Sequence, residues 1–468
     1  MVALEARHVL VLGLGETGLS TARYAARRKA ARICVADTRS APPGLDALRA
    51  AVPEARFVAG PFGLALLDGV DVVVASPGVP LAEPVVRAAR ERGLPVLGDI
   101  ELFAQALPRD HRPQVAGITG TNGKTTVTAL TGALLAACGM DVEVAGNIGP
   151  AALDALMRRE DEGAMPQAWV LELSSFQLES TSTLACDAAA MLNLSEDHLD
   201  RYASMDDYAA AKARIFAAGG VQVLNRDDAW SRRMALAGRT VVTFGLDAPS
   251  NPADFGLLRV RDALWLARGN TPLVALDELR IAGMHNAANA LAALALAKTV
   301  GGRCASMLMA VREFAGLPHR VQRVAETGGI VFYDDSKGTN VGSTIAAMRG
   351  LGEPIAARGG KVVLIAGGEG KGQDFAPLAG PVAESARAVV LIGRDVPLIR
   401  EALAGAGVPV QTAASMAVAV AQARALARPG DVVLLSPACA SFDMFRNYKH
   451  RGEAFVAAVR ELADARPA

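Results

Sequence analysis

The chain lacks a net charge, because its 48 lysines and arginines are balanced by 48 aspartates and glutamates. This balance gives no electrostatic reason to expect a nucleic-acid or membrane-surface partner, although local cationic pockets are compatible with it. No stretch reaches the ~18 uninterrupted apolar residues of a spanning helix, and residues 1–20 place charged side chains around a short apolar run, unlike a signal peptide. We therefore expect a cytoplasmic protein with no nucleic-acid partner and no membrane span.

Cysteine is scarce and scattered. The five cysteines are odd in number and contain no C-x-x-C pair: Cys34, Cys138, Cys186, Cys304 and Cys439. This spacing argues against a disulfide framework and against a zinc site. The cysteines fit a reducing cytoplasm.

At 468 residues the chain is too long for one ordinary core, and about three domains of ~150 residues are expected. Short apolar runs such as 8–12, 188–192 and 432–435 alternate with alanine-rich helical segments. This alternation predicts an α/β fold of three doubly wound domains with mainly parallel sheets. We place them at 1–102 (Rossmann-like), 103–316 (a phosphate-loop ATPase type) and 317–468 (Rossmann-like), with binding sites at strand ends in the clefts.

The most informative segment is GITGTNGKTT at residues 117–126. Glycines before a helix let backbone N–H groups surround a polyphosphate, Lys124 can reach the outer phosphates, and the Thr125 hydroxyl can ligate Mg²⁺. The spacing is one residue longer than the usual phosphate loop, and a glycine-rich turn is the alternative. The predicted ATP-binding residues of the loop are Gly120, Thr121, Asn122, Gly123, Lys124, Thr125 and Thr126.

A second glycine motif spans residues 13–18, GLGETG, and Asp37 ends the next predicted strand. The pattern is typical of dinucleotide-binding folds and on its own suggests a dehydrogenase. It requires only a diphosphate at a helix N-terminus, however, so a nucleotide-sugar diphosphate satisfies it equally well. A structural tight turn is the third interpretation.

Polar side chains follow several predicted strands. Glu172 ends the run 169–173, where a carboxylate is either the Mg²⁺ partner of the loop hydroxyl or a solvated strand cap. His198 stands among three acids after the run 188–192, a setting that suits a second cation. Lys212, 14 residues later, is by itself a solvated helix lysine.

Asn286 and Asn289 lie one turn apart at the start of a predicted helix, and an N-cap role for Asn286 is the alternative to ligand binding. In the third domain, residues 334–340, 367–372 and 436–442 each follow a predicted strand. Three polar, glycine-bearing strand ends with two lysines predict an anion pocket.

Together these residues resemble the Mur ligases, cytoplasmic enzymes that build the peptide of the cell-wall precursor. The likeness runs over nearly the whole chain, and residues 334–340 and 436–442 are similar to the family branch that adds D-glutamate. It implies a magnesium-dependent ligase that joins D-glutamate to UDP-N-acetylmuramoyl-L-alanine through an acyl phosphate made from ATP. Gly338 replaces the alanine more usual in its motif, and we expect a monomer.

The resemblance also implies roles for individual residues. Thr125 and Glu172 would hold one Mg²⁺ and His198 a second, while Lys212 would carry a carbamate made from CO₂ and so help to form the metal site. With Lys124, the residues Glu172, His198 and Lys212 would be catalytic. Further contacts would come from Asn289, Arg320 and Asp335 to ATP; from Gly15, Glu16, Thr17, Thr38, Arg39, Ser76 and Asn147 to the UDP-sugar; and from Lys337, Thr339, Lys371, Ser441 and Phe442 to D-glutamate.

Three other function classes fit these residues less well. A nicotinamide-dependent oxidoreductase would use residues 13–18 but would leave Lys124, Glu172 and the third domain without a task. A non-catalytic nucleotide-regulated binding protein would not need two metal sites and an anion pocket. A folylpolyglutamate synthase would share the ATP machinery without needing a UDP-binding first domain.

Overall fold

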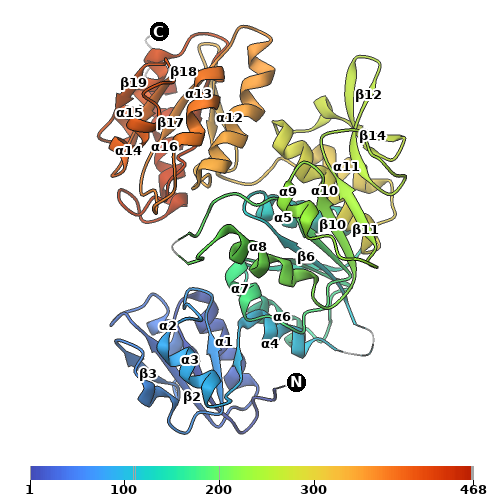
Figure 1. The fold of residues 1–468 in the computed structure, drawn as a ribbon, viewed down its shortest axis with the longest axis vertical. Helices are drawn as coiled ribbons and strands as arrows, with labels where there is room; N and C mark the ends of the chain where they lie inside the picture. Colours follow the sequence, from blue (N-terminus) through green and yellow to red (C-terminus); the bar gives the residue numbers. More distant parts are fainter. Residues whose placement is uncertain (1, 109, 111, 200, 465–468) are drawn as a thin grey trace.

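The computed structural model describes residues 2–108, 110, 112–199 and 201–464. Three sheets follow one another along the chain, and Figure 1 shows the blue first domain and the orange-red third domain on either side of the central one. The expected α/β fold with mostly parallel sheets is confirmed.

The first domain is a five-stranded parallel sheet in the order β3-β2-β1-β4-β5. Valine, leucine and alanine fill β1 and β4, and these strands are almost wholly buried, as parallel strands covered on both faces require. The strands are β1 (His8–Leu12), β2 (Arg32–Asp37), β3 (Arg56–Ala59), β4 (Val72–Ala75) and β5 (Val96–Leu97), and the helices are α1 (Glu16–Arg27), α2 (Leu45–Ala51) and α3 (Pro84–Glu91).

The central domain holds a nine-stranded sheet in the order β14-β13-β12-β11-β10-β9-β6-β8-β7. Its last three strands pair antiparallel, an extension that the search for buried apolar runs had not predicted. The strands are β6 (Gln114–Thr119), β7 (Val142–Gly146), β8 (Ala168–Glu172), β9 (Ala188–Met191), β10 (Val221–Asn225), β11 (Val241–Phe244), β12 (Phe255–Val260), β13 (Ala263–Arg268) and β14 (Thr271–Ala275). The helices are α4 (Asp99–Ala106), α5 (Lys124–Ala137), α6 (Ala152–Asp161), α7 (Ser175–Glu179), α8 (Met205–Ala213), α9 (Ala229–Arg233), α10 (Met284–Thr299) and α11 (Ser306–Glu313).

The third domain is a six-stranded sheet in the order β15-β16-β20-β17-β18-β19, in which only the edge strand β15 pairs antiparallel. The strands are β15 (Gln322–Thr327), β16 (Ile330–Asp334), β17 (Val362–Ala366), β18 (Ala386–Leu391), β19 (Val410–Thr412) and β20 (Val432–Leu435). The helices are α12 (Val341–Ala356), α13 (Ala379–Ser385), α14 (Val396–Ala402), α15 (Met416–Leu426) and α16 (Tyr448–Asp464).

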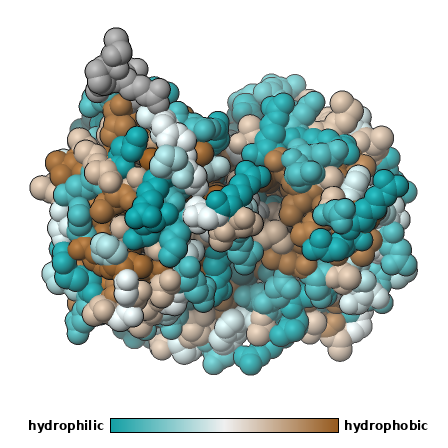
Figure 2. Space-filling view, turned by 90° about the horizontal axis from the view of Figure 1, so that it is seen from above, coloured by the Kyte–Doolittle hydropathy of each residue, from teal (hydrophilic) through white to brown (hydrophobic). Residues whose placement is uncertain are grey.

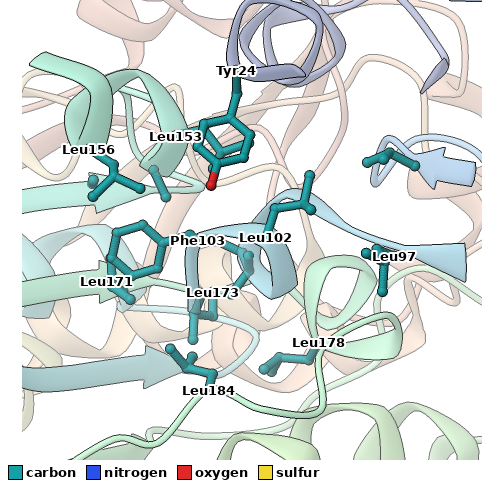
Figure 3. Packing of buried hydrophobic residues seen from close by; sticks show 14 of the residues in the cluster. Tyr24, Leu97, Leu102, Phe103, Leu153, Leu156, Leu171, Leu173, Leu178 and Leu184 are labelled. Carbon is teal, nitrogen blue, oxygen red and sulfur yellow. The ribbon is translucent and has the colours of Figure 1, made fainter. Parts of the chain in front are cut away.

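The first and central domains share one hydrophobic core. Figure 3 shows Tyr24 of α1 beside Leu153 of α6, with Phe103 of α4 close by. The Phe103 ring meets the Trp169 ring edge-on at 4.9 Å between centroids. The third domain has separate clusters, and it meets the central domain both through α12 packed against α10 and through polar contacts such as that of Arg320 with Thr125.

Seen from above, the third domain and the central domain form two lobes with a hollow between them, and hydrophilic and hydrophobic side chains are interspersed over both (Figure 2). No helix among the described residues is both long enough and apolar enough to cross a membrane.

One expectation about cysteine was wrong. Cys138, at the end of α5, and Cys304, before α11, form a disulfide with their Cα atoms 5.5 Å apart. The 166 residues between them hide this proximity in the sequence, and only the packing of α11 against α5 brings the two thiols together. The other three cysteines, Cys34, Cys186 and Cys439, are buried and free.

Candidate functional site

The glycine loop after β6 forms a closed turn at the start of α5. Gly120 and Gly123 have φ values of 149° and 83°, which favour glycine, and a side chain on Gly123 would collide with Asn289. The Lys124 ammonium donates to the carbonyl oxygens of Gly120 and Thr121, both at 2.8 Å. The Thr125 hydroxyl accepts a hydrogen bond from Arg320 of the third domain.

Two lysines converge on a single carbonyl. Lys212 of α8 is 1% exposed, and its amine also donates to the Gly120 oxygen at 2.8 Å. Burial lowers the pKa of Lys212 well below its usual value, and the nearby Lys124 lowers it further. The interpretation of Lys212 as a solvated helix lysine was therefore wrong.

Glu172, at the end of β8, is a buried carboxylate whose charge acts to raise the pKa values of both Lys124 and Lys212. Its Oε1 accepts a hydrogen bond from the Asn147 amide at 2.6 Å, whereas its buried Oε2 has no hydrogen-bond partner among the described residues. Burial lowers the pKa values of Lys124, Arg320 and Lys337, whereas the negative charge of Glu172 acts to raise them. A desolvated carboxylate oxygen without a donor is a fitting ligand for a cation.

Protein side chains alone do not form a complete metal cage here. Within the described part of the chain, no group of three or more His, Cys, Asp and Glu side chains is arranged to hold a metal ion. Mg²⁺ is commonly bound by one or two carboxylates together with substrate phosphates and waters, so this arrangement fits a magnesium nucleotide better than a free structural ion.

His198 lies on a strained turn close to the loop. Its φ is 57°, an uncommon value for a residue other than glycine, and its Nε2 is 3.7 Å from the Asp197 carboxylate. Its ring meets the Phe176 ring edge-on at 4.7 Å. Burial lowers the pKa of His198 and so favours the neutral imidazole, the form that binds metals.

A cavity of about 250 Å³ opens beside the glycine loop, between the central and third domains. The predicted ATP-contacting residues Asn289, Arg320 and Asp335 line it, and so does Lys337, which was expected at D-glutamate. Burial lowers the pKa of Lys337 to about 8, and burial raises that of Asp335 to about 7.

The search of the sequence missed other walls of this cavity. Asn225 and Phe244 line it from the carboxyl ends of β10 and β11, and His285 lines it from α10. The strand-end rule that found Glu172 would have found the first two had the runs 221–225 and 241–244 been recognised. Asn286 does not cap α10, which begins at Met284 after Gly283, so that alternative was wrong.

A separate cavity of about 410 Å³ lies in the first domain. Six of the predicted UDP-sugar residues line it: Gly15, Glu16, Thr17, Thr38, Arg39 and Ser76. An added Cβ on Gly15 would meet no atom within 4 Å, so the backbone there is open to a ligand. The seventh predicted residue, Asn147, lies instead at Glu172.

The Asp37 carboxylate in this cavity is already saturated. It accepts from the Leu14 N–H at 2.7 Å, from the Arg39 N–H at 2.9 Å, and from the Arg39 guanidinium at 2.8 Å on each oxygen. Arg39 is the main cause that lowers the pKa of Asp37 to about 2. Four donors fill the sites of a carboxylate, so Asp37 is not free to accept a ribose hydroxyl as in NAD-binding folds.

Comparison with known proteins agrees with this geometry. Three family models match successive stretches: the Mur ligase MurD-like N-terminal domain over residues 7–98, the Mur ligase middle domain over 118–297 and the Mur ligase glutamate ligase domain over 319–439. The UDP-N-acetylmuramoylalanine--D-glutamate ligase of Nitrosospira multiformis is 58% identical over 99% of this chain and 97% of its own length. The chain belongs to the Mur ligase family.

Other Mur ligases support the same placement. The Aromatoleum aromaticum protein with the same name as the Nitrosospira one is 55% identical over the full length of both chains. A UDP-N-acetylmuramate-alanine ligase of Thermotoga maritima has a TM-score of 0.60 at 19% identity, covering 97% of this chain and all of its own. A pseudomurein peptide ligase of Methanothermus fervidus also has a TM-score of 0.60, at 16% identity over the same shares of the two chains. At such identities these two structures show the fold alone, and the expected family membership is confirmed.

The third domain of this Mur ligase reaches the glycine loop through Asn340, which belongs to the predicted segment 334–340 but had no role of its own assigned from the sequence. Asn340 caps α12, and its amide donates to Asn122 at 3.1 Å and to Asp197 at 3.2 Å. These bonds bring the loop after β16, with Thr339, against both the phosphate loop and the His198 turn. Asparagine is a common N-cap, so the capping role of Asn340 could have been predicted from the sequence. Its partners Asn122 and Asp197 are too far along the chain to have been predicted.

The remaining predicted D-glutamate residues lie on two loops of the third domain. Lys371 is exposed on the loop after β17 with a φ of 52°, and its charge contributes to lowering the pKa values of both His198 and Lys337. Ser441 is buried, whereas Phe442 is 68% exposed on the same loop after β20. A bridge between Glu369 and Ala440 joins the two loops.

Proposed function

We propose that this Mur ligase uses ATP to join D-glutamate to UDP-N-acetylmuramoyl-L-alanine, with ADP and phosphate as the other products. The expected activity agrees with the name that its 51–58% identical relatives share. The observation that carries the proposal is the buried Oε2 of Glu172, which lacks a partner among the described residues and lies near the charges of Lys124 and Arg320 beside a glycine loop. We place the reaction in the cytoplasm, on a monomer with domains at 1–102, 103–316 and 317–468.

The first-domain cavity would hold the uridine diphosphate. The N-terminus of α1 and its glycines would face the diphosphate, while Thr38, Arg39 and Ser76 would fix the nucleoside end. The saturated Asp37 weighs against a dinucleotide at the same place. The muramoyl-alanine end would extend toward Asn147 at the central site.

ATP would lie with its phosphates on residues 120–126 and its nucleoside in the cavity lined by Asn289, Arg320 and Asp335. Thr125 and Glu172 would hold one Mg²⁺, and His198 with a carbamylated Lys212 would hold a second. Bound Mg²⁺ supplies positive charge that offsets the charge developing on the transferred phosphoryl group. Lys124 would donate to the same phosphoryl oxygens, exchanging its present backbone acceptors for the nucleotide.

Lys212 is prepared for carbamylation by its surroundings. The neutral amine adds to the carbon of CO₂ and releases one proton, so the side chain changes from a neutral group to an anion. Burial and the neighbouring Lys124 both favour the neutral amine that this step needs. Tyr208 lies below the amine, with the nitrogen 4.6 Å from its ring centroid, and keeps water away from one side.

The L-alanyl carboxylate would attack the γ-phosphorus of ATP, and ADP would leave. The neutral amine of D-glutamate would then attack the acyl phosphate, and phosphate would depart as the amide forms. Lys337, Thr339, Lys371, Ser441 and Phe442 are the proposed surroundings of D-glutamate. Contacts such as Asn340 to Asn122 hold the third domain over the central one, where it would exclude water from the acyl phosphate.

Oxygen transfer tests the proposed chemistry. The substrate is made with ¹⁸O in the L-alanyl carboxylate, and the released phosphate is examined by mass spectrometry. An acyl phosphate intermediate predicts one ¹⁸O atom in each phosphate. Phosphate that carries only oxygen from ATP or from water would refute the proposed route.

A further inference from the structure

Arg201 connects the first-domain cavity with the His198 turn of the central domain. It lies between β9 and α8, and its side chain is 11% exposed. Its guanidinium donates to the Pro77 oxygen at 2.9 Å and to the Val79 oxygen at 3.3 Å, both in the first domain. A third bond, of 2.9 Å, goes to the Glu179 carboxylate of the central domain.

The first-domain end of this connection is a wall of the proposed UDP-sugar cavity. Pro77 and Val79 follow Ser76, whose hydroxyl donates to the Gly13 oxygen at 2.9 Å. All four of these residues line the cavity. Ser76 therefore holds the loop after β4 against the glycine motif, and Arg201 connects the same loop to the central domain.

The central-domain end is the turn that carries His198. The backbone N–H groups of Arg201 and Tyr202 donate to the His198 oxygen at 2.9 and 3.2 Å. The Tyr202 hydroxyl donates to Glu179 at 2.5 Å, so the carboxylate that pairs with Arg201 also holds the next residue.

An aromatic ring completes the support. The Arg201 guanidinium lies over the Phe176 ring, 4.3 Å from its centroid, and the same ring meets the His198 imidazole edge-on. Because His198 has a positive φ, its turn depends on outside contacts to keep its geometry. These contacts include those made by Arg201, Glu179 and Phe176, together with the Asp197 carboxylate, which accepts from the His198 N–H at 3.0 Å and from Asn340.

We infer that Arg201 is a positioning residue that couples occupancy of the first-domain cavity to the placement of His198. The inference rests on the proposed function, because it takes the cavity to hold the uridine diphosphate. Its side-chain contacts are with Pro77, Val79, Glu179 and Phe176, none of which is a proposed catalytic residue. Through it, binding of a distant part of the substrate would raise the rate at the reaction centre, a use of remote binding energy that is known for enzymes in general.

Two substrates distinguish coupling from simple structural support. The full substrate is compared with N-acetylmuramoyl-L-alanine 1-phosphate, which lacks uridine and the second phosphate. Coupling predicts a higher kcat for the full substrate in the wild type, and a fall in this kcat ratio of about tenfold in Arg201→Met, the factor for one charge-assisted hydrogen bond. A merely structural role would lower kcat for both substrates by the same factor.

Arg214 provides the matched control. It also donates to two backbone oxygens, those of Leu178 and Thr181, both at 2.7 Å, but all three residues lie in the central domain. Arg214→Met is expected to leave the kcat ratio unchanged. A similar fall in this variant would overturn the assignment to Arg201.

Folding is checked by circular dichroism and thermal melting. If Arg201→Met does not fold, Arg201→Lys decides, because a lysine keeps the charge but lacks the planar guanidinium fork that spans both carbonyls and Glu179. An unchanged kcat ratio in a folded Arg201 variant refutes the coupling, as does equal kcat for the two substrates in the wild type. Absence of any wild-type turnover with the full substrate and D-glutamate would instead contradict the proposed function.

Discussion

Replacement of Lys212 tests the most specific part of the proposed metal site. The amines of Lys212 and Lys124 each lie 2.8 Å from the Gly120 oxygen, so the two nitrogens are within about twice that distance of each other. Two positive charges ~5 Å apart repel by about 3 kcal/mol at an effective dielectric constant of about 20. This repulsion lowers the pKa of Lys212, in the direction that leaves its amine neutral.

A carbamate on Lys212 reverses the sign of this interaction. The same arithmetic then gives an attraction of about 3 kcal/mol to Lys124, in addition to any bond to a metal ion. Lys212→Ala removes the anion, and we expect kcat to fall at least about 100-fold, as for loss of one preorganised charged contact.

The assay is ADP release with and without added formate, acetate or propionate. Small carboxylates are expected to restore part of the activity of Lys212→Ala, because they return an anion to the vacated space. Lys124→Ala is the matched control and should gain nothing, because the lost group is a cation. Wild-type protein equilibrated with ¹³CO₂ should show a carbamate signal that is absent from Lys212→Ala. Full activity of Lys212→Ala would refute the reasoning. A lack of rescue by the carboxylates, together with a ¹³C spectrum that is the same for Lys212→Ala and the wild type, would also refute it.

Three further predictions follow from other parts of the molecule. Gly15→Val should raise KM for the UDP-sugar and leave the melting temperature near that of the wild type. Gly18→Ala should instead destabilise the fold, because its Cβ would overlap the Gly13 oxygen. Equal losses of stability in the two variants would contradict this prediction. Lys371→Ala should raise KM for D-glutamate by roughly 10- to 150-fold and leave KM for ATP nearly unchanged, and the reverse pattern in steady-state titrations would assign Lys371 to the nucleotide. Burial lowers the pKa of His285 from 6.5 to about 4. Between these two pH values the unfolded chain binds a proton at His285 and the folded chain does not. The free energy of unfolding therefore rises with pH by about 3 kcal/mol across this range. In urea unfolding measured from pH 4.5 to 7.5, the free energy of unfolding of His285→Gln should lack this rise with pH. The same pH dependence in the variant and the wild type would exclude the contribution of His285.

The local sequence pattern was sufficient to predict those parts of the site that lie within a single short segment. Residues 120–126, 13–18 and the strand-end Glu172 each follow a buried strand, so their environment is visible within a few neighbouring residues. Lys212 was misjudged on the same basis, since helix position says nothing about the loop that covers its amine. Only the resemblance to a family assigns Lys212 to the metal site, and that role stays a prediction.

Contacts between distant segments were beyond the reach of the sequence. Asn340 meets Asn122 across 218 residues, and Arg201 meets Pro77 across 124. The disulfide between Cys138 and Cys304 is of the same kind. The antiparallel strands β12–β14 were missed for a different reason, because parts of them are exposed and they lack the continuous apolar runs that mark buried parallel strands.

The most direct test of the central claim is ADP release by the wild-type protein with UDP-N-acetylmuramoyl-L-alanine, ATP and Mg²⁺, measured with each of a panel of amino acids in both stereochemical forms. The account predicts ADP release with D-glutamate and one molecule of amide product for each ADP. Release that is equally fast with L-glutamate or with a basic amino acid, or no release with any of them, would contradict it.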